Sequence, residues 1–143
     1  MPSIARLLET ALYVEDLERS VRFYQDVFGF ESMEGDGREF EGRVLYPLQL
    51  PGRSVLLLFL KSSCRATTVL PGGTIPPHDG SGRLHLAFAI SAAELEGWRE
   101  RLQAQGVAIE GETAWPRGGT SLYIRDPDGH LLELATPGLW SIY

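Results

Sequence analysis

Three side chains able to bind a divalent metal, Glu9, His85 and Glu133, stand at comparable places in this sequence. Glu133 lies within the apolar run 131–134, where a buried carboxylate is costly unless a cation, a metal or water compensates it. One imidazole and two carboxylates leave coordination positions open on an octahedral metal, as in sites for Fe, Mn, Ni or Zn. The residue types therefore favour a metal centre with room for a substrate and water.

Each of these residues also has a simpler interpretation. Strand side chains alternate, so the pattern alone places Glu133 in solvent, the commoner situation for a glutamate. Glu9 fits an exposed acid on an edge strand, and a lone histidine such as His85 is more often a core residue bonded to a backbone carbonyl. Only the shared position of the three residues in a repeated unit favours the metal.

The repeated unit has the order β-α-β-β-β and occurs twice. In the first copy Asp16 caps the helix, Gly29 ends it, and a turn is predicted at 34–37. The strands predicted for the first copy are 7–14, 30–33, 43–50 and 54–60. In the second copy Ser91 and Glu94 form a capping box and Gly106 ends the helix. The strands predicted there are 84–90, 107–109, 120–125 and 131–136.

The spacing of the two copies relates the candidate ligands. Glu9 and His85 are 76 positions apart (85 − 9) on the first strands of their units. The same shift places the counterpart of Glu133 near position 57, where the sequence has only leucines. Three of the four equivalent positions therefore carry a ligand and the fourth does not.

These patterns predict an α+β fold in which two βαβββ modules form curved mixed sheets around a cleft. At 143 residues the chain is expected to be a single domain. Module 1 is predicted at about 5–62 and module 2 at about 83–136, joined by a Pro- and Gly-rich loop at 63–82. The apolar tail 137–143 is expected to pack on the domain, on a partner subunit or at the mouth of the cleft.

Charge and cysteine content narrow the class of protein. The formal net charge of −6, without any basic run, argues against nucleic acid or an anionic membrane surface as a partner. Cys64 is the only cysteine, so the chain has no internal disulfide and no cysteine-based zinc site, and a cytoplasmic location is expected. The first residues contain no apolar stretch typical of a signal peptide or membrane span.

Several motifs resemble those of the vicinal oxygen chelate superfamily, which includes glyoxalase I, extradiol dioxygenases, fosfomycin resistance transferases and bleomycin-binding proteins. Residues 9–17, with Phe23-Tyr24 and Gly29-Phe30, are similar to its opening, and 85–88 and 126–133 resemble its later signatures. The resemblance implies the paired-module fold named for glyoxalase, bleomycin resistance protein and dioxygenase, usually as a homodimer. It carries Glu9, His85 and Glu133 onto the metal-ligand positions.

The chain departs from this pattern in three ways. Glu9 stands where many members have histidine, which makes the ligand set harder and more anionic. The fourth ligand of glyoxalase-like members is absent, which weakens that assignment. No Lys or Arg follows Arg125, which argues against the basic cluster of fosfomycin enzymes.

Five residues are candidates for contacting a substrate. Ser121 and Tyr123 resemble substrate-contacting residues of the fosfomycin-type members, and Arg125 shares their strand face. His78 lies near the end of the Pro-rich loop, where it could reach over the pocket, and Trp115 precedes the same strand and could wall a pocket. Tyr123 also fits a half-buried strand aromatic, and His78 also fits a solvent-exposed loop histidine.

The sequence thus predicts a metal-dependent enzyme acting on a small substrate with two neighbouring oxygens, with dioxygenase-like chemistry favoured. A glyoxalase-like lyase or isomerase is the alternative among enzymes. A protein that sequesters a small antibiotic-like ligand without metal is the alternative from another class.

Overall fold

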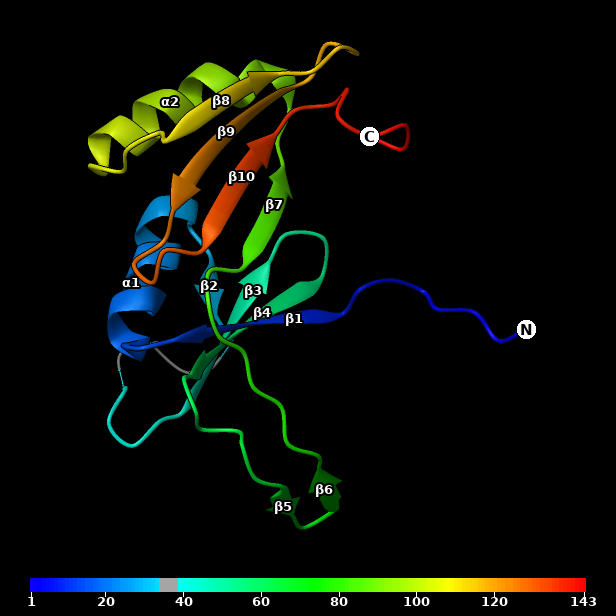
Figure 1. Ribbon diagram of the computed structural model, residues 1–143, viewed down its shortest axis with the longest axis vertical. Coiled ribbons are helices and arrows are strands. Elements are labelled where there is room, and N and C mark those ends of the chain that lie inside the picture. The colour runs from blue at the N-terminus through cyan, green and yellow to red at the C-terminus, as the bar shows by residue number, and fades with distance from the viewer. Residues whose placement is uncertain (34–38) are drawn as a thin grey trace. The chain divides into compact units, whose positions relative to one another are not determined.

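The computed structural model describes residues 1–33 and 39–143 and divides into two compact units, Met1–Ser81 (unit 1) and Gly82–Tyr143 (unit 2). The turn predicted at 34–37 lies outside the described residues. Unit 1 contains β1 (Glu9–Val14), α1 (Leu17–Phe28), β2 (Glu31–Ser32), β3 (Leu45–Leu50), β4 (Ser54–Leu60), β5 (Thr68–Leu70) and β6 (Gly73–Ile75) (Figure 1). Unit 2 contains β7 (His85–Ala89), the 3₁₀ turn η1 (Ala92–Glu94), α2 (Leu95–Ala104), β8 (Gly111–Ala114), β9 (Thr120–Arg125) and β10 (Leu131–Ala135).

Each unit builds one four-stranded mixed sheet with the same connectivity. The strand order is β1-β4-β3-β2 in unit 1 and β7-β10-β9-β8 in unit 2. In each sheet the first strand runs parallel to the last one, while the remaining pairs are antiparallel. The predicted α+β fold with two β-α-β-β-β units is therefore confirmed.

Helix α1 forms where apolar residues recur at helical spacing. Asp16 accepts a hydrogen bond from the backbone N–H of Arg19 at 2.9 Å, and Gly29 ends the helix in the left-handed conformation at φ 70°. Leu17, Val21 and Tyr24 are buried. Together with the buried side chains on one face of the unit 1 sheet they make the apolar core of that unit, to which Leu12, Val14, Tyr46, Leu48, Leu56 and Leu58 belong.

The second helix also begins as predicted, through a capping box. Both reciprocal bonds between Ser91 and Glu94 are present, and they open η1, which leads into α2. Leu102 of α2 is fully buried. The core of unit 2 is completed by one face of its sheet, which contributes Leu122, Ile124, Leu132 and Leu134.

One predicted strand, 107–109, is wrong. The backbone N–H of Val107 bonds to the carbonyl of Leu102, so this residue still belongs to the exit from α2. The ladder with β9 starts only at Glu110, whose N–H bonds to the carbonyl of Tyr123, and β8 follows at Gly111–Ala114. Val107 and Ile109 are half-buried and alternate with exposed neighbours, so this short stretch fits the strand pattern although it is the exit from a helix.

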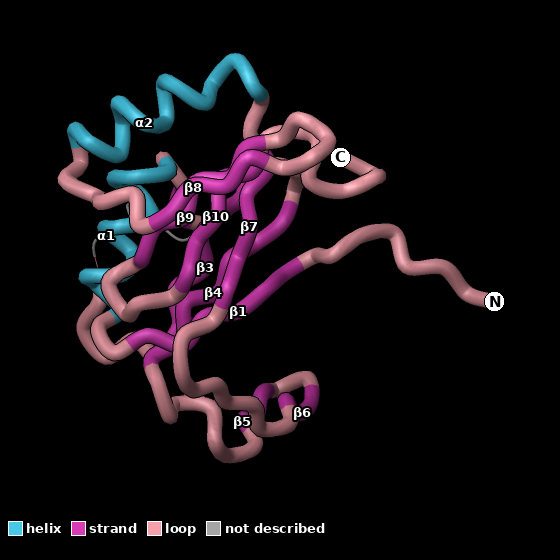
Figure 2. Tube along the Cα trace, turned by 45° about the horizontal axis from the view of Figure 1, so that its top comes forward, coloured by secondary structure: helices cyan, strands magenta, loops and turns pink. Residues whose placement is uncertain are grey.

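The Pro- and Gly-rich segment predicted as a loop contains a small hairpin, formed by β5 and β6. The hairpin lies apart from the four-stranded sheet of its own unit (Figure 2). An ion pair of 2.7 Å between Arg65 and Asp79 joins the two ends of the segment. Its apolar side chains are largely exposed, with Val69 at 78 %.

The C-terminal tail folds back on unit 2. The Tyr143 hydroxyl donates to the carbonyl of Ile90 at 2.7 Å and lies 3.3 Å from the carbonyl of Ala135, just beyond the end of β7 and at the end of β10. Of the three places considered for the tail, its own unit is the one observed for Tyr143. No helix of the described residues is long and apolar enough to cross a membrane.

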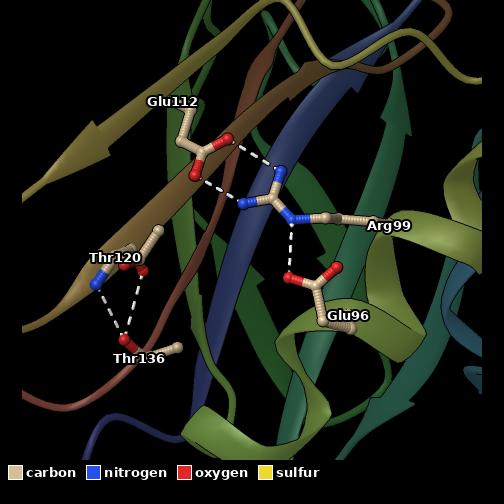
Figure 3. Close-up of polar contacts among 5 residues, drawn as sticks. All are labelled: Glu96, Arg99, Glu112, Thr120 and Thr136. Carbon is tan, nitrogen blue, oxygen red and sulfur yellow. Dashed lines mark hydrogen bonds and ion pairs between the residues drawn. The ribbon is translucent and has the colours of Figure 1, made fainter.

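Polar contacts tie α2 to the outer strand of its sheet (Figure 3). The guanidinium of Arg99 binds both carboxylate oxygens of Glu112 on β8, one of them at 2.7 Å, and also Glu96 at 3.1 Å. Just beyond β10, the Thr136 hydroxyl accepts a hydrogen bond from the N–H of Thr120, the first residue of β9, at 2.8 Å. The Arg99–Glu112 contact therefore fixes the helix against the sheet that carries His85 and Glu133.

The Arg99–Glu112 ion pair predicts a pH-dependent contribution to stability. The hydrogen bond from Arg99 holds the pKa of the Glu112 carboxyl below its usual range. Because the folded-state pKa is the lower one, the pair stabilises the protein above the ordinary pKa of about 4.3, and this contribution is lost as the pH falls through the lowered value. We expect Arg99→Gln to lower the melting temperature at pH 7 and to lower it less at acid pH.

The matched control is Arg117→Gln, which removes the same charge from a loop of unit 2 without breaking this pair. Melting curves of both variants and the wild type, recorded from pH 7 downwards, make the measurement. An Arg99→Gln deficit that is independent of pH would show that the pair does not contribute.

Candidate metal centre

One face of the unit 2 sheet gathers most of the predicted site residues. Glu133 on β10 is directly opposite Tyr123 on β9 and beside Ala87 on β7. Because strand side chains alternate, every second residue of these strands shares the face of Glu133. The predicted site residues placed there are His85, Ser121, Tyr123, Arg125 and Glu133.

Glu133 is only 4 % exposed, so the simple expectation that it faces solvent is wrong. The Ser121 hydroxyl donates to its Oε1 at 2.5 Å, and the Tyr123 hydroxyl lies 3.3 Å from the same oxygen. Hydrogen bonds of this kind are what allow a carboxylate to be buried. Oε1 is therefore committed to the protein, which leaves Oε2 for another partner.

Trp115 takes part in holding this carboxylate. Its indole N–H donates to the Ser121 oxygen at 2.8 Å, and Ser121 in turn donates to Glu133. Ser121 is fully buried. The sequence suggested Trp115 and Ser121 as groups around a pocket, and the structure gives both a positioning role behind Glu133.

His85 presents a lone pair to the remaining oxygen of Glu133. Its Nδ1 lies 3.0 Å from the carbonyl of Leu131, and because a carbonyl can only accept, Nδ1 carries the proton. In the neutral ring Nε2 is then an acceptor, and it faces Oε2 of Glu133 at 3.2 Å. Two acceptors at this separation repel each other unless a proton or a metal cation lies between them.

The geometry of this pair fits a metal. With metal–ligand bonds of about 2.1 Å, two ligand atoms stand about 3.0 Å apart at a right angle and about 3.4 Å apart at the tetrahedral angle. The observed 3.2 Å falls between these values. A backbone carbonyl bonded to the other ring nitrogen is also typical of metal-binding histidines. The His85 side chain is 49 % exposed, which leaves access from solvent.

The third predicted ligand, Glu9, belongs to unit 1. It is exposed and opens β1, as His85 opens β7. In β1 and β4, Ala11 pairs with Leu57, as Ala87 pairs with Glu133 in β7 and β10. Leu57 is therefore the structural counterpart of Glu133 at a shift of 76 positions (133 − 57). Across the described parts of the chain, no three His, Cys, Asp or Glu side chains come together to hold a metal.

The two remaining candidates have partners that the sequence did not reveal. Arg125 forms an ion pair of 2.5 Å with Glu110 and donates to the carbonyl of Gly129 at 3.1 Å. In unit 1, Nδ1 of His78 and the hydroxyl of Tyr13 form a hydrogen bond of 2.7 Å. No sequence pattern marks Tyr13, which looks like one apolar residue of a strand.

Comparison with known proteins identifies the family. Residues 6–134 match the model of the Glyoxalase/Bleomycin resistance protein/Dioxygenase superfamily, and the chain belongs to it. It is 27 % identical over 135 residues to a lactoylglutathione lyase of Haemophilus influenzae, covering 90 % of each chain.

Solved structures agree with this assignment. A lactoylglutathione lyase from Agrobacterium tumefaciens is 33 % identical, with a TM-score of 0.83 over 98 % of this chain and 99 % of the other. A variant of the fosfomycin resistance protein FosX from Listeria monocytogenes, complexed with Mn(II) and 1S,2S-dihydroxypropylphosphonic acid, is 26 % identical. Its TM-score is 0.68, over 96 % of this chain and 95 % of the other.

The bond from Ser121 predicts a stability effect that needs no metal. Ser121→Ala removes the donor from a buried carboxylate, and we expect the free energy of unfolding to fall by about 1–3 kcal/mol. Urea denaturation of the protein in chelator provides the measurement. Glu133→Gln in both backgrounds completes a double-mutant cycle, in which a large coupling is expected.

Thr113→Ala is the matched control, because Thr113 is the cross-strand neighbour of Ser121 on β8. Its hydroxyl has no hydrogen bond to Glu133 in the described residues. Equal losses for the two alanine variants would contradict the role given to Ser121.

Proposed function

We propose that this protein is a metal-dependent enzyme of its superfamily, with His85, Glu133 and Glu9 as the metal ligands. The observation that carries the proposal is the His85–Glu133 pair, in which Nε2 and Oε2 face each other at 3.2 Å. Each side chain is oriented from behind, His85 by a backbone carbonyl and Glu133 by Ser121. When the imidazole is neutral both atoms are acceptors, and a metal cation bound between them would remove their mutual repulsion.

The ligand set favours a hard divalent ion. Two carboxylates and one imidazole suit Mn(II), Fe(II), Ni(II) or Zn(II), and the FosX variant similar to this chain was solved with Mn(II). Such an ion supplies Lewis acidity to a bound oxygen and holds the substrate in place. We take Mn(II) and Fe(II) as the ions to test first.

The proposed substrate is a small molecule with two neighbouring oxygens that share one metal. Three protein ligands leave coordination positions open for such a pair, and Leu57 at the counterpart of Glu133 supplies no fourth ligand. This arrangement favours dioxygenase-like chemistry on a catechol-type substrate. The protein residues contribute fixed hydrogen bonds that orient His85 and Glu133.

The residues around Glu133 then divide into two groups. Ser121 and Trp115 hold the carboxylate and are assigned to positioning, because Ser121 is fully buried. Tyr123 is half-buried, and its hydroxyl lies 3.3 Å from Oε1 of Glu133. We assign Tyr123 to contact with the substrate. Arg125 is neutralised by Glu110, so a substrate anion would first have to displace that partner.

A glyoxalase-like lyase is the second candidate function. The solved lactoylglutathione lyase from Agrobacterium tumefaciens is similar over almost the full length of both chains, which favours it. The leucine at position 57 argues against it, because lyase-like members of the superfamily are expected to use a fourth ligand there.

We also propose that the chain forms a homodimer, in which Glu9 of one copy or of its partner completes the site. The β5–β6 hairpin supports association, since an isolated two-stranded hairpin with exposed Val69, Leu70 and Ile75 gains stability from contact with another surface. Light scattering after gel filtration tests this assembly.

The metal assignment predicts the metal content of four variants. After loading with Mn(II) and gel filtration, the wild type should retain about one ion per chain, and His85→Ala and Glu133→Ala should retain almost none. His78→Ala and Glu112→Ala are the matched controls, because they remove the same groups elsewhere and should retain the ion. Elemental analysis makes the measurement, and bound metal should raise the melting temperature.

Metal retained by both ligand variants would overturn the site. A wild-type protein without metal under all loading conditions would instead favour the metal-free ligand-binding alternative.

The two enzymatic candidates predict different substrates. The Fe(II)-loaded protein should consume oxygen with catechols if it is dioxygenase-like, and Glu133→Ala should abolish this activity. A lyase should isomerise the hemithioacetal of methylglyoxal and glutathione without oxygen. Conversion of only the hemithioacetal would replace the first candidate by the second.

A further inference from the structure

The sheet face of unit 1 that carries Glu9 also carries a second polar group farther along β1. Glu9, Ala11 and Tyr13 share this face because strand side chains alternate. Tyr13 lies four positions after Glu9 in the strand, which corresponds to about 13 Å along β1. A group at Tyr13 is therefore too far along the strand to bind a metal held by Glu9.

Tyr13 is clamped in one position. Its ring stacks on Phe59 of β4, with centroids 5.9 Å apart and planes at 24°. A Cβ atom on Gly80 would clash with the Tyr13 ring, so only glycine allows the loop to pass here. The loop that ends unit 1 thus closes directly over this tyrosine.

The same loop delivers His78 to the Tyr13 hydroxyl. The imidazole Nδ1 lies 2.7 Å from that oxygen, and the ring contacts Phe59 edge-on with centroids 4.8 Å apart. The backbone N–H of His78 is bonded to the carbonyl of Cys64 at 2.9 Å, and Arg65 neutralises Asp79 next to it. His78 is consequently not the exposed loop residue that its Pro-rich surroundings suggest.

The direction of the hydrogen bond leaves a donor on His78. Burial, with smaller effects of Cys64 and Asp79, raises the pKa of the Tyr13 phenol, so the phenol keeps its proton and donates to Nδ1. With Nδ1 as the acceptor of this bond, the ring proton of His78 lies on Nε2. Among the described residues of unit 1, Nε2 has no hydrogen-bond partner.

Unit 2 has no such arrangement at the equivalent place. The shift of 76 positions takes Tyr13 to Ala89 and Phe59 to Ala135, two alanines that pair with each other in the sheet. Fold alone therefore does not require two aromatic rings and a histidine here. Between Glu9 and this cluster, the unit 1 sheet face is apolar and half-buried, with Ala11, Leu57 and Pro47 in one row.

We propose that Tyr13 and His78 form a second binding position, in which His78 donates a hydrogen bond to a carboxylate or carbonyl oxygen at the far end of an elongated substrate. The apolar body of that substrate lies over Leu57 and Pro47, and its vicinal oxygens lie at the Glu9 end. The inference rests on the proposed function for the Glu9 end only. The substrate is then a catechol-like molecule that carries an oxygen acceptor on its side chain.

The test compares two probes that differ at the far end only. Caffeate has vicinal hydroxyls and a distant carboxylate, whereas 4-methylcatechol has the hydroxyls alone. Isothermal titration of the metal-free protein in chelator should show that caffeate binds at least 10-fold more tightly than 4-methylcatechol. A hydrogen bond to a charged group is strong enough to account for a difference of this size. Using metal-free protein separates this inference from the metal site.

Four variants test the residues. His78→Phe keeps an aromatic ring and should abolish the 10-fold preference without changing the affinity for 4-methylcatechol. Tyr13→Phe and Gly80→Ala should reduce the preference, the first by removing the phenol and the second by displacing its ring. His78→Gln retains an N–H donor and should restore part of the preference.

Tyr46→Phe is the matched control, because it removes a hydroxyl that bonds to Ser32 on the buried side of the same unit. It should leave both affinities unchanged. A caffeate preference that persists in His78→Phe, or its absence from the wild type, would overturn the inference. Failure of the wild type to retain Mn(II) in the loading experiment would count against the metal site. It would not affect the caffeate preference measured in chelator.

Discussion

The buried carboxylate of Glu133 is the constraint on which the arrangement of side chains in unit 2 depends. Glu133 lies between Leu132 and Leu134 on a central strand, where an uncompensated charge would cost several kcal/mol. The protein satisfies one oxygen with Ser121 and Tyr123 and turns the other towards the lone pair of His85. A sheet that needed only to fold would have an apolar residue here, as the unit 1 sheet has with Leu57.

The two units have the same backbone arrangement but carry different side chains on the equivalent sheet face. Both sheets have the same strand order and the same parallel pairing, so each position in one has a counterpart in the other. In unit 2 the shared face carries His85 and Glu133 beside small alanines. In unit 1 the same face carries leucine and the Tyr13–Phe59 pair. Differences in side chains on a common backbone thus give unit 2 the His85–Glu133 pair and give unit 1 two stacked aromatic rings.

Local patterns allowed much of this fold to be predicted. Apolar spacing, Asp16 and Gly29 located α1, and alternation located the long strands, because these signals depend on neighbours in sequence. The short strand β8 was misplaced because the half-buried Val107 and Ile109 at the exit from α2 show the same alternation as a strand. The burial of Glu133, the indole bond of Trp115 and the Tyr13–His78 pair depend on residues 6 to 65 positions apart, and no local pattern encodes them.

The orientation of His85 depends on the backbone carbonyl of Leu131 rather than on a side chain. Any residue at position 131 supplies that carbonyl, so the partner that fixes the imidazole cannot be removed by substitution and leaves no trace in the identity of residue 131. Only a change in the pairing of β7 with β10 would move it. Evolution can therefore vary the side chains around this histidine widely while its ring keeps the same tautomer and direction.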